Sequence, residues 1–474
     1  MLAVSLVAAT LFVQSERPLA REPEIRGVWI PNSHSTFFDS RENVRAQMQA
    51  LADAGVNVVF PVVWSKGMTL FKSDVAEVVT GIAIDPRYGE RDPLAEVLFE
   101  AHRHGIEVVP WFEYGFAAGH ETFPGKALEA RPEWAALDAA GQPVVKNGFQ
   151  WMNSLDEEVQ AFITGLVIEC ATDYDVDGVQ GDDRLPALPV EAGYDAKTVE
   201  RYRREHREPP PSDCRDPEWI QWRADLLTDY LASLREDVRD LSPDLAFSMA
   251  PGAPGWSLRE YLQDQATWLE RGLVDALHPQ LYARDAEGYV RMADEMLAVE
   301  WLDKERDRIA PGALSSFREY LIDPETALGA VAANRERRLV GEVWFYERGL
   351  IENEGAVAVA LAEGPYAKRA RLPWRKSANW RPPALVGAPA PAGDEVAWRV
   401  RPPADGTYRI WVEEKPAEGE PEGTDPAAPG PGWTPLGTKR LSRGRTNDLI
   451  RVPKDASDDV LRVLAIIDRR AERR

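Results

Sequence analysis

The chain has 474 residues, of which 44% are hydrophobic and 28% charged, and its formal net charge at pH 7 is -22. These values are ordinary for a globular protein, so a large core is possible and general disorder is excluded. The negative charge argues against a nucleic-acid partner, because a polyanion would be repelled. At roughly 150 residues per domain, the length favours one large domain and a smaller one.

Residues 1–13 are continuously apolar apart from Ser5 and Thr10, and they are too short to span a bilayer. They are typical of the core of a secretory signal, although no Lys or Arg precedes them. We therefore expect residues 1–23 to be a signal segment and the protein to be exported, to the periplasm, the cell wall or the medium. A buried or flexible amino terminus is the alternative. No later segment reaches transmembrane length, so we expect no membrane span.

Short apolar runs alternate eight times with stretches of helical period. The expected strands are 24–30, 56–63, 106–112, 175–184, 245–249, 274–282, 308–313 and 341–346. The expected helices are 41–54, 92–104, 155–172, 218–241, 258–271, 287–298, 324–338 and 356–361. Eight such rounds predict a (β/α)8 barrel over residues 24–372. An open doubly wound sheet is the alternative, but no glycine-rich nucleotide motif follows the first strand.

Two loops, 113–154 and 183–217, are much longer than usual, and we expect both to wall the active-site mouth.

After residue 373 proline and glycine become dense and the helical period ends. Segments 396–400, 406–412 and 461–467 are typical of short strands, and 414–432 of a mobile loop. Residues 373–474 therefore predict a small β-sandwich-like accessory domain. This domain could bind a sugar or the cell wall, or it could pack against the barrel without binding a ligand.

The fourth expected strand ends in two adjacent carboxylates, Asp182 and Asp183. Side chains alternate along a strand, so Gln180 and Asp182 share a face. The carboxyl ends of barrel strands are where such enzymes hold their catalytic groups. Capping of the next loop is the alternative role for the pair. Asp175 and Asp177 lie at the other end of the strand, where we expect a structural role.

Polar and aromatic residues follow the other strands too, and a closed barrel would bring them to one mouth. The candidate catalytic residues are Glu113, Asp182, Asp183 and Glu347. The candidate substrate-binding residues are Asn32, His34, Trp64, Trp111, Gln180, Arg184, Gln280, Tyr282 and Tyr346. Such a set suits glycosidic cleavage, in which one acid protonates the leaving oxygen and a second carboxylate attacks or activates water. The acid needs a raised pKa, which burial near another carboxylate supplies.

Several of these residues could instead have purely structural roles. Glu113 could cap a loop, Glu347 could pair with Arg348, and His34 could orient a loop rather than contact a substrate. Cys170 and Cys214 are too few for a disulfide framework. Neither lies at metal-ligand spacing, and no HExxH pattern or histidine cluster occurs. We therefore expect no metal site and no cofactor.

Six motifs in order resemble the glycosyl-hydrolase-like 10 family of bacterial envelope proteins, over roughly residues 24–350. They lie at 26–29, 57–64, 110–115, 177–183, 193–195 and 216–223. The resemblance implies a (β/α)8 barrel and glycoside hydrolysis. Some relatives act on peptidoglycan strands without peptides, which implies that substrate class here. The family's fourth-strand motif places its final pair on Asp182 and Asp183, and its Trp-Phe-Glu motif places an acid on Glu113.

Two other likenesses are partial. The fourth strand is similar to the amylase motif that ends in a nucleophilic Asp, but Gln180 stands where amylases have arginine. It is also similar to the chitinase motif, but Arg184 takes the place of the acid glutamate.

The carboxyl-terminal segment looks like golvesin-type β-modules through residues 436–438 and the closing strand.

The sequence thus predicts an exported hydrolase of a cell-envelope polysaccharide, most specifically peptide-free peptidoglycan strands. Asp182 is expected to be the nucleophile or base, and Asp183, Glu113 or Glu347 the acid. A noncatalytic glycan-binding protein on a barrel scaffold is the alternative from another class. The set of several carboxylates argues against it, because binding alone does not require them. A lyase or deacetylase is a third interpretation, and the missing metal motif disfavours the deacetylase.

Overall fold

The computed structural model describes residues 20, 22–375, 380–382, 384–392, 395–402, 405–414, 433–442, 448–451 and 460–472. The expected signal segment lies outside these residues except for its positions 20, 22 and 23. The expected mobile loop lies outside them except for its first residue, 414. No helix within the described ranges is long and apolar enough to cross a membrane.

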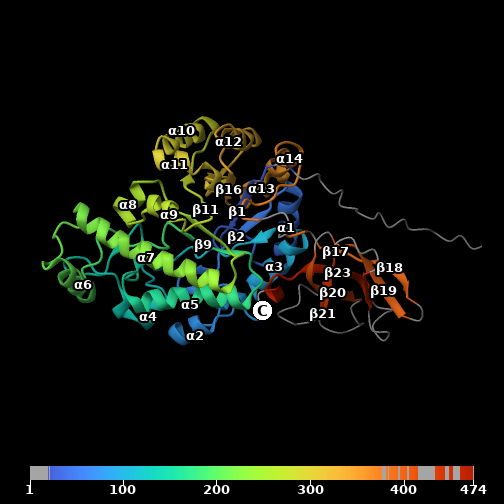
Figure 1. The fold of residues 1–474 in the computed structure, drawn as a ribbon, viewed down its shortest axis with the longest axis horizontal. Helices are drawn as coiled ribbons and strands as arrows, with labels where there is room; N and C mark the ends of the chain where they lie inside the picture. Colours follow the sequence, from blue (N-terminus) through green and yellow to red (C-terminus); the bar gives the residue numbers. More distant parts are fainter. Residues whose placement is uncertain are drawn as a thin grey trace, which may run out of the picture.

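Eight parallel strands form a closed barrel, and Figure 1 shows the labelled barrel strands at the centre with helices outside them. They are β1 (Ile25–Ile30), β2 (Val58–Pro61), β5 (Glu107–Val108), β9 (Gly178–Asp182), β10 (Ala246–Ala250), the consecutive pair β11 (Ala276–Leu277) and β12 (Gln280–Leu281), β13 (Gly312–Leu314) and β16 (Gly341–Phe345). One sheet runs β12-β13-β16-β1-β2-β5 and another β11-β10-β9. A parallel bridge between Trp111 and Gln180 joins them on one side, and the chain from β11 into β12 joins them on the other. The predicted (β/α)8 barrel is confirmed.

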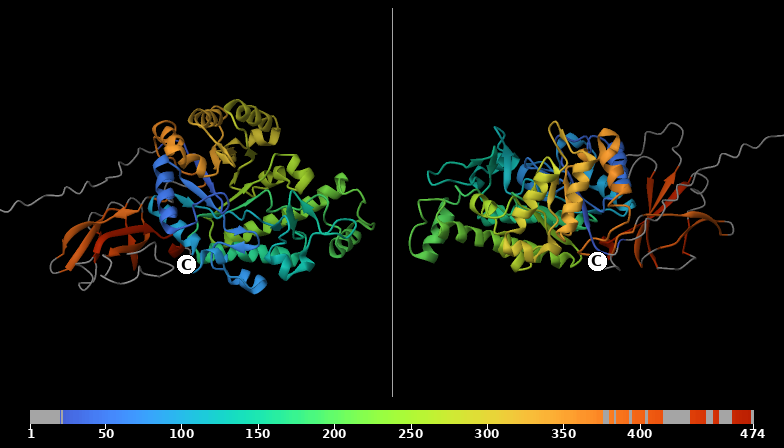
Figure 2. Two further views of the ribbon diagram at one scale, coloured as in Figure 1. Left: turned by 180° about the vertical axis from the view of Figure 1, so that it is seen from behind. Right: turned by 90° about the horizontal axis from the view of Figure 1, so that it is seen from above.

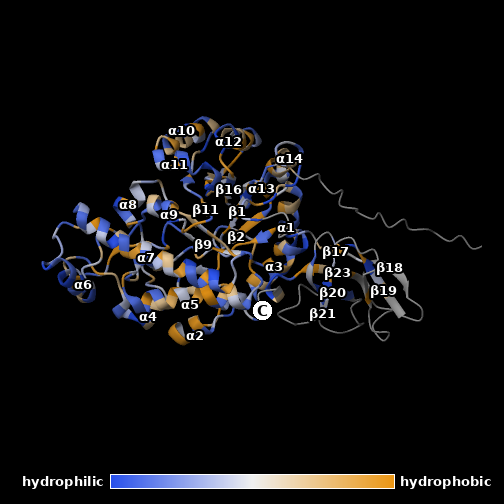
Figure 3. Cartoon of the chain, in the orientation of Figure 1, coloured by the Kyte–Doolittle hydropathy of each residue, from blue (hydrophilic) through white to orange (hydrophobic). Residues whose placement is uncertain are grey.

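The main helices follow the strands as predicted. They are α1 (Arg41–Ala54), α3 (Pro93–Arg103), α5 (Glu157–Asp173), α7 (Pro217–Leu241), α9 (Gln265–Glu270), α10 (Ala286–Leu297), α12 (Pro324–Glu336) and α14 (Ala356–Glu363). Capping side chains set the starts of all of these except α14: Asp92 and Asp216, for example, accept backbone hydrogen bonds in the first turn and precede a proline. In Figure 3, central β2 is hydrophobic whereas α6 (Ala196–His206), which follows β9, is hydrophilic.

The prediction of one helix over 258–271 was wrong. The segment forms α8 (Trp256–Tyr261) and α9, separated by Leu262 at φ +60° and by Asp264, which caps α9. A capping Asp inside the helical pattern starts a new helix because it satisfies free backbone N–H groups.

The two long loops carry structure of their own. The first contains β6 (Ala117–His120), α4 (Lys126–Ala130), β7 (Val145–Lys146) and β8 (Phe149–Trp151), with the strands in one antiparallel sheet. The second contains α6. Because they leave the carboxyl ends of β5 and β9, both stand at the mouth, as expected.

The carboxyl-terminal domain is built from two antiparallel sheets. One contains β17 (Leu385–Val386), β23 (Val460–Ile467), β20 (Gly406–Glu414) and β21 (Trp433–Leu441); the other contains β18 (Ala388–Ala392), β19 (Glu395–Val400) and β22 (Asp448–Arg451). Side chains from both sheets share one core, including Trp398, Tyr408, Ile450 and Val463. This is the predicted β-sandwich-like domain. All views place it beside α3, on the side of the barrel away from α6 and α8 (Figure 2).

A buried ionic cluster, named here the junction cluster, joins the two domains. Arg381 Nη2 lies 2.9 Å from Asp177 Oδ1, Arg375 Nε lies 2.8 Å from Glu107 Oε1, and Arg469 Nη1 lies 3.1 Å from Asp177 Oδ1. Asp177 and Glu107 start or precede barrel strands, whereas the arginines follow the barrel. Asp177 is therefore structural, as its position in the strand suggested.

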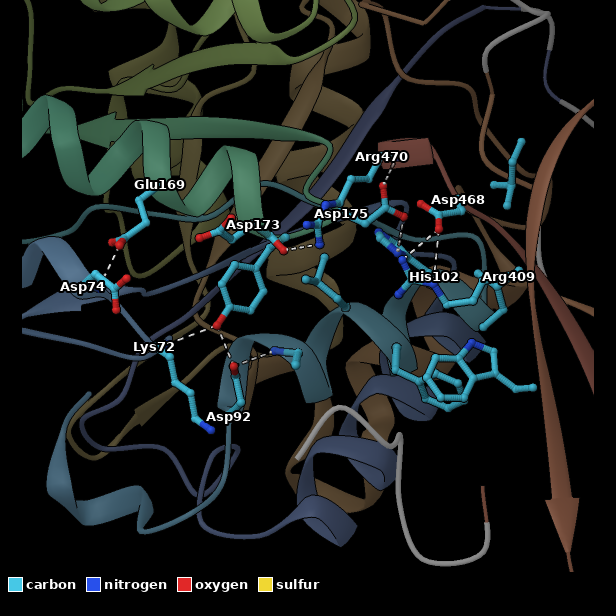
Figure 4. A pocket seen from close by; sticks show the side chains of 17 residues that line it. Lys72, Asp74, Asp92, His102, Glu169, Asp173, Asp175, Arg409, Asp468 and Arg470 are labelled. Carbon is cyan, nitrogen blue, oxygen red and sulfur yellow. Dashed lines mark hydrogen bonds and ion pairs between the residues drawn. The ribbon is translucent and has the colours of Figure 1, made fainter. Parts of the chain in front are cut away.

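A cavity of about 490 Å³ lies beside the junction cluster, between α3, the end of α5 and the β-sandwich (Figure 4). Leu98, Phe99 and Trp411 form its apolar part. Its polar groups are largely paired with one another, for example Arg409 with Asp468 at 2.8 Å. The cavity is thus a seam between the domains, at the end of the barrel opposite the mouth.

Candidate active site

Arg184 gathers three of the four candidate catalytic carboxylates. Its Nη2 lies 2.9 Å from Asp182 Oδ2 and 3.8 Å from Glu113 Oε1, and its Nη1 lies 3.0 Å from Asp183 Oδ1. Its Nε donates to the Glu113 carbonyl oxygen at 2.7 Å. The sequence suggested that Arg184 binds substrate, but in the structure it holds the carboxyl ends of β5 and β9 together.

Two glycines allow this close approach. Gly115 has φ +48°, and a Cβ there would lie 2.2 Å from the Arg184 carbonyl oxygen. A Cβ on Gly181 would lie 2.4 Å from the Leu185 carbonyl oxygen. A side chain at Gly115 would push apart the turns that follow β5 and β9, and one at Gly181 would displace the turn that carries Asp182 and Asp183.

Asp182 is the most tightly held of the three acids. Its Oδ2 accepts from Trp111 Nε1 at 3.1 Å, and its Oδ1 accepts from the Arg184 backbone N–H at 2.8 Å. Gln263 Nε2 donates to its carbonyl oxygen at 2.8 Å. The side chain is only 1% exposed. Burial raises the pKa of Asp182 well above its usual range, although Arg184 opposes the shift.

Glu113 and Asp183 reach the solvent. Their side chains are 19% and 28% exposed. Burial raises the pKa of Glu113, Arg184 and Lys66 lower it, and the charge of Asp183 raises it further. The Glu113 carboxylate makes no hydrogen bond within the described chain, so it is free to donate a proton to a bound molecule.

Glu347 stands apart from this group. Its Oε1 accepts a short hydrogen bond from the Ser35 hydroxyl, and its Oε2 has no partner among the described residues. Burial raises the pKa of Glu347 to about 8. No hydrogen bond or ion pair between described residues connects it to Arg184 or to the other acids.

Among the expected substrate-binding residues, Trp111 and Tyr282 lie at the carboxylates. Trp111 bonds Asp182, as described above. Tyr282 stacks on Phe345 with ring centroids 5.0 Å apart. Burial, followed by the charges of Asp183 and Asp182, raises its pKa. Gln280 is half-buried and donates to the Ala250 carbonyl at 3.0 Å.

Other expected binding residues are placed in the walls or the core. Trp64 is fully buried and donates to the Gly115 carbonyl at 3.0 Å. The Gln180 amide accepts from Trp29 at 2.6 Å and donates to Ser248 at 3.1 Å, so both ends are used inside the barrel. These two side chains are core residues and do not line the mouth.

The last three expected binding residues lie on the β1 side of the mouth. Tyr346 is buried, and its hydroxyl donates to the carbonyl of the exposed His34 at 2.9 Å. Asn32 is half-buried and accepts from Ser65 Oγ at 3.3 Å. Tyr346 and His34 thus fix the loop that follows β1.

Sequence reasoning missed three residues that shape the site. Ser35 holds Glu347, Gln263 holds the Asp182 backbone, and the Phe149 ring lies 4.8 Å from the Arg184 guanidinium carbon. Ser35 follows His34 in a loop already assigned to the mouth, so it could have been found. Gln263 lies where one continuous helix was expected, and no sequence signal marked it. In the described ranges, no group of three or more His, Cys, Asp or Glu side chains is arranged to hold a metal ion.

The comparisons with known proteins give the family of this chain. The sequence profile of the family described as glycosyl hydrolase-like 10 matches residues 24–321. Glycosyl hydrolase DigH of Escherichia coli (strain K12) is 26% identical over 339 residues, which cover 61% of this chain and 71% of the relative. Glycosyl hydrolase YngK of Bacillus subtilis (strain 168) is 24% identical over 435 residues, 81% of each chain.

Solved barrels share the fold. The glycoside hydrolase domain of PgaB (BpsB) from Bordetella bronchiseptica has a TM-score of 0.52 at 14% identity, covering 71% of this chain and 98% of that domain. The catalytic domain of β-amylase from Paenibacillus polymyxa has a TM-score of 0.52 at 10% identity, covering 73% and 98%. The family match ends before the β-sandwich, so the likeness of that domain to golvesin-type modules stays a prediction.

Proposed function

Because the chain belongs to the glycosyl hydrolase-like 10 family and is a glycoside hydrolase, we propose that it cleaves a cell-envelope polysaccharide, most specifically peptidoglycan strands freed of their peptides. The observation that carries the hydrolytic part is the set of three carboxylates around Arg184 at the mouth. Glycosidic cleavage needs one carboxyl group as acid and a second carboxylate as nucleophile or base, and three carboxyl groups surround this guanidinium.

The roles follow from exposure and hydrogen bonding. Glu113 is the proposed acid, because its pKa is raised and no donor occupies its carboxylate. The nucleophile or base is one of the adjacent pair Asp182 and Asp183. The sequence pointed to Asp182, but donors occupy both oxygens of that buried carboxylate. Exposure favours Asp183, with Asp182 keeping Arg184 in place.

The substrate class and the export belong to the proposal. The family resemblance supports peptide-free strands, and the apolar residues 1–13 support export. The net charge of -22 argues against nucleic acid as a competing polymer.

The first test is release of reducing ends from peptide-free peptidoglycan strands, with chitin and starch as controls. We expect release by the wild type and at least a 100-fold loss in both Asp182→Asn and Asp183→Asn. No release from any glycan, with unchanged glycan binding in both variants, would replace the hydrolase by a binding protein.

Chemical rescue separates the two aspartates. In Asp183→Gly, azide can enter the space of the missing carboxylate and attack the sugar, so activity should return together with a glycosyl azide product. In Asp182→Gly, azide should restore nothing, because this carboxylate positions Arg184. Rescue of Asp182→Gly alone would return the nucleophile or base role to Asp182.

A further inference from the structure

A short hairpin stands beside the end of β16 at the mouth. Its strands are β14 (Ser316–Phe317) and β15 (Tyr320–Leu321), directly after β13. Arg348 Nη1 donates to the Arg318 carbonyl at 2.9 Å, which fixes the hairpin tip to the segment that follows β16. Phe317 is 43% exposed. An exposed aromatic on a fixed turn at the mouth offers a stacking surface.

Two arginines lie over the aromatic rings of this hairpin. The Arg318 guanidinium carbon lies 5.3 Å from the Phe317 ring centroid, and that of Arg284 lies 5.7 Å from the Tyr320 centroid. The Tyr320 hydroxyl donates to the Arg284 carbonyl at 3.1 Å. Both arginines are exposed, and neither makes an ion pair with a residue that the structure describes.

Two acids near the hairpin in sequence cap helices, whereas the exposed Glu319 directly follows Arg318 at the tip. Asp285 accepts from the Gly288 backbone N–H at 2.7 Å and caps α10. Asp323 accepts from the Thr326 backbone N–H at 2.9 Å and caps α12. In a chain of net charge -22, two exposed cations without ion-pair partners in the described chain are available to attract an anion.

The arginines lie near the catalytic carboxylates. Arg284 follows Tyr282 by two residues, and the Tyr282 ring stacks on Phe345, the last residue of β16, with centroids 5.0 Å apart. Two residues span at most about 7 Å, the length of fully extended chain, so Arg284 stays close to Tyr282. A sugar next to the one being cleaved would therefore come within reach of the Arg284 side chain.

We propose that Arg284 and Arg318, together with Phe317 and Tyr320, form a subsite for a sugar that carries a free carboxylate. This inference rests on the proposed function and deepens it. In intact peptidoglycan every second sugar carries a lactyl group whose carboxylate is tied to the peptide as an amide. Removal of the peptide frees that carboxylate, and a guanidinium recognises a carboxylate through paired, charge-assisted hydrogen bonds. The subsite accounts for selection of peptide-free strands by attraction to the exposed charge.

Binding is measured with the Glu113→Gln protein, so that the result does not depend on turnover. The probes are peptide-free strands of defined length, the same strands with their carboxylates converted to amides, and chitin oligosaccharides. We expect tighter binding of the free carboxylate form, and a Kd for that form about fivefold weaker with Arg284→Gln or Arg318→Gln. The amidated strands should bind these variants and their parent alike, and added salt should reduce the preference.

Two further variants serve as controls. Arg45→Gln, which removes an exposed arginine of α1, should leave every Kd unchanged. Phe317→Ala should weaken free and amidated strands equally, because stacking does not depend on the carboxylate. The subsite would be overturned if the parent protein bound free and amidated strands equally, or if the arginine variants weakened binding of the two kinds of strand equally. Either result would overturn it even if the enzyme cleaves the glycan. Selective binding with no cleavage by the wild-type protein would overturn the proposed hydrolysis and keep the subsite.

Discussion

Arg184 and Asp182 are joined twice: the backbone N–H of Arg184 donates to Asp182 Oδ1 at 2.8 Å, and its guanidinium donates to Asp182 Oδ2 at 2.9 Å. The two bonds fix the carboxylate in one orientation. They also fix the guanidinium, whose other nitrogens face Asp183 and the Glu113 carbonyl. One cation therefore lets three acids lie close together without prohibitive repulsion.

The first prediction concerns this guanidinium. Arg184→Lys keeps the charge but lacks the planar fork, so it cannot hold Asp182, Asp183 and the Glu113 turn at once. We expect kcat to fall about 100-fold, because misplacement of reacting groups by about 1 Å costs that much. Thermal unfolding should show that the variant is folded. Arg271→Lys, in an exposed pair with Asp229, is the matched control and should keep full activity. Activity of Arg184→Lys within threefold of wild type would contradict the role.

The second prediction separates the two candidate acids. Glu113→Gln should lower kcat on the polysaccharide by about 100- to 10,000-fold, because no proton reaches the leaving oxygen. On an aryl glycoside whose leaving group needs no proton, it should retain most of its activity. The alkaline limb of the kcat/KM profile, set by the raised pKa of Glu113, should disappear.

Glu347→Gln provides the comparison, because no hydrogen bond or ion pair among the described residues links Glu347 to Arg184 or its three acids. Its activity on both substrates should stay within about threefold of wild type. If Glu347→Gln lost activity on the polysaccharide but not on the aryl glycoside, and Glu113→Gln stayed active on both, Glu347 would be the catalytic acid in place of Glu113.

Much of the barrel could be predicted from sequence, because the strands are short apolar runs and most of the main helices start at a capping side chain. The convergence of Glu113, Asp182 and Asp183 followed from the barrel alone, since parallel strands end at one rim. Arg184 was placed at the rim, but its role was not foreseen. Whether a guanidinium faces a substrate or its own neighbours depends on the fold of the turn, which Gly115 and Gly181 permit.

The core positions were harder to predict. Gln180 and Asp182 point to the same face of their strand, into the barrel. The alternation of side chains along a strand does not tell which of the two is buried inside the barrel and which lies at its mouth. Trp64 follows a strand end, but the chain turns there into the short strands β3 (Trp64–Ser65) and β4 (Met68–Thr69), which leave the ring buried. Contacts between domains, such as Arg381 with Asp177, leave no periodic signal in either partner.

The third prediction concerns pH and stability. The pKa of Glu347 is about 8 in the folded protein and about 4.5 as an ordinary glutamate, so the folded state holds this proton more tightly. Its contribution to stability is therefore complete below pH 4.5 and is lost as the pH rises towards 8, by up to about 5 kcal/mol. Glu347→Gln, which stays neutral, should unfold like wild type in urea at pH 4.5 and be more stable at pH 8. Glu352→Gln, which changes an exposed glutamate, should be no more stable than wild type at pH 8. If Glu347→Gln also shows no gain at pH 8, the pKa of Glu347 is not raised and its carboxylate is ionised at neutral pH.

The last prediction concerns the junction cluster. Burial alone would raise the pKa of Asp177, but Arg381, His102 and Arg469 outweigh it and hold the pKa well below its usual range. Arg381 is fully buried and donates to Asp177 at 3.0 and 2.9 Å and to the Ile467 carbonyl at 2.7 Å.

Arg381→Met fills a similar volume but leaves the buried charge of Asp177 with fewer partners. We expect urea unfolding at pH 7 to show a loss of about 3 to 5 kcal/mol. Arg409→Met breaks a more exposed pair with Asp468 and should cost less than about 1 kcal/mol. Because a depressed carboxyl pKa stabilises above its unfolded value, the difference between Arg381→Met and wild type should shrink as the pH falls below about 4. Equal losses for both arginines would mean that the β-sandwich packs on the barrel without relying on the junction cluster.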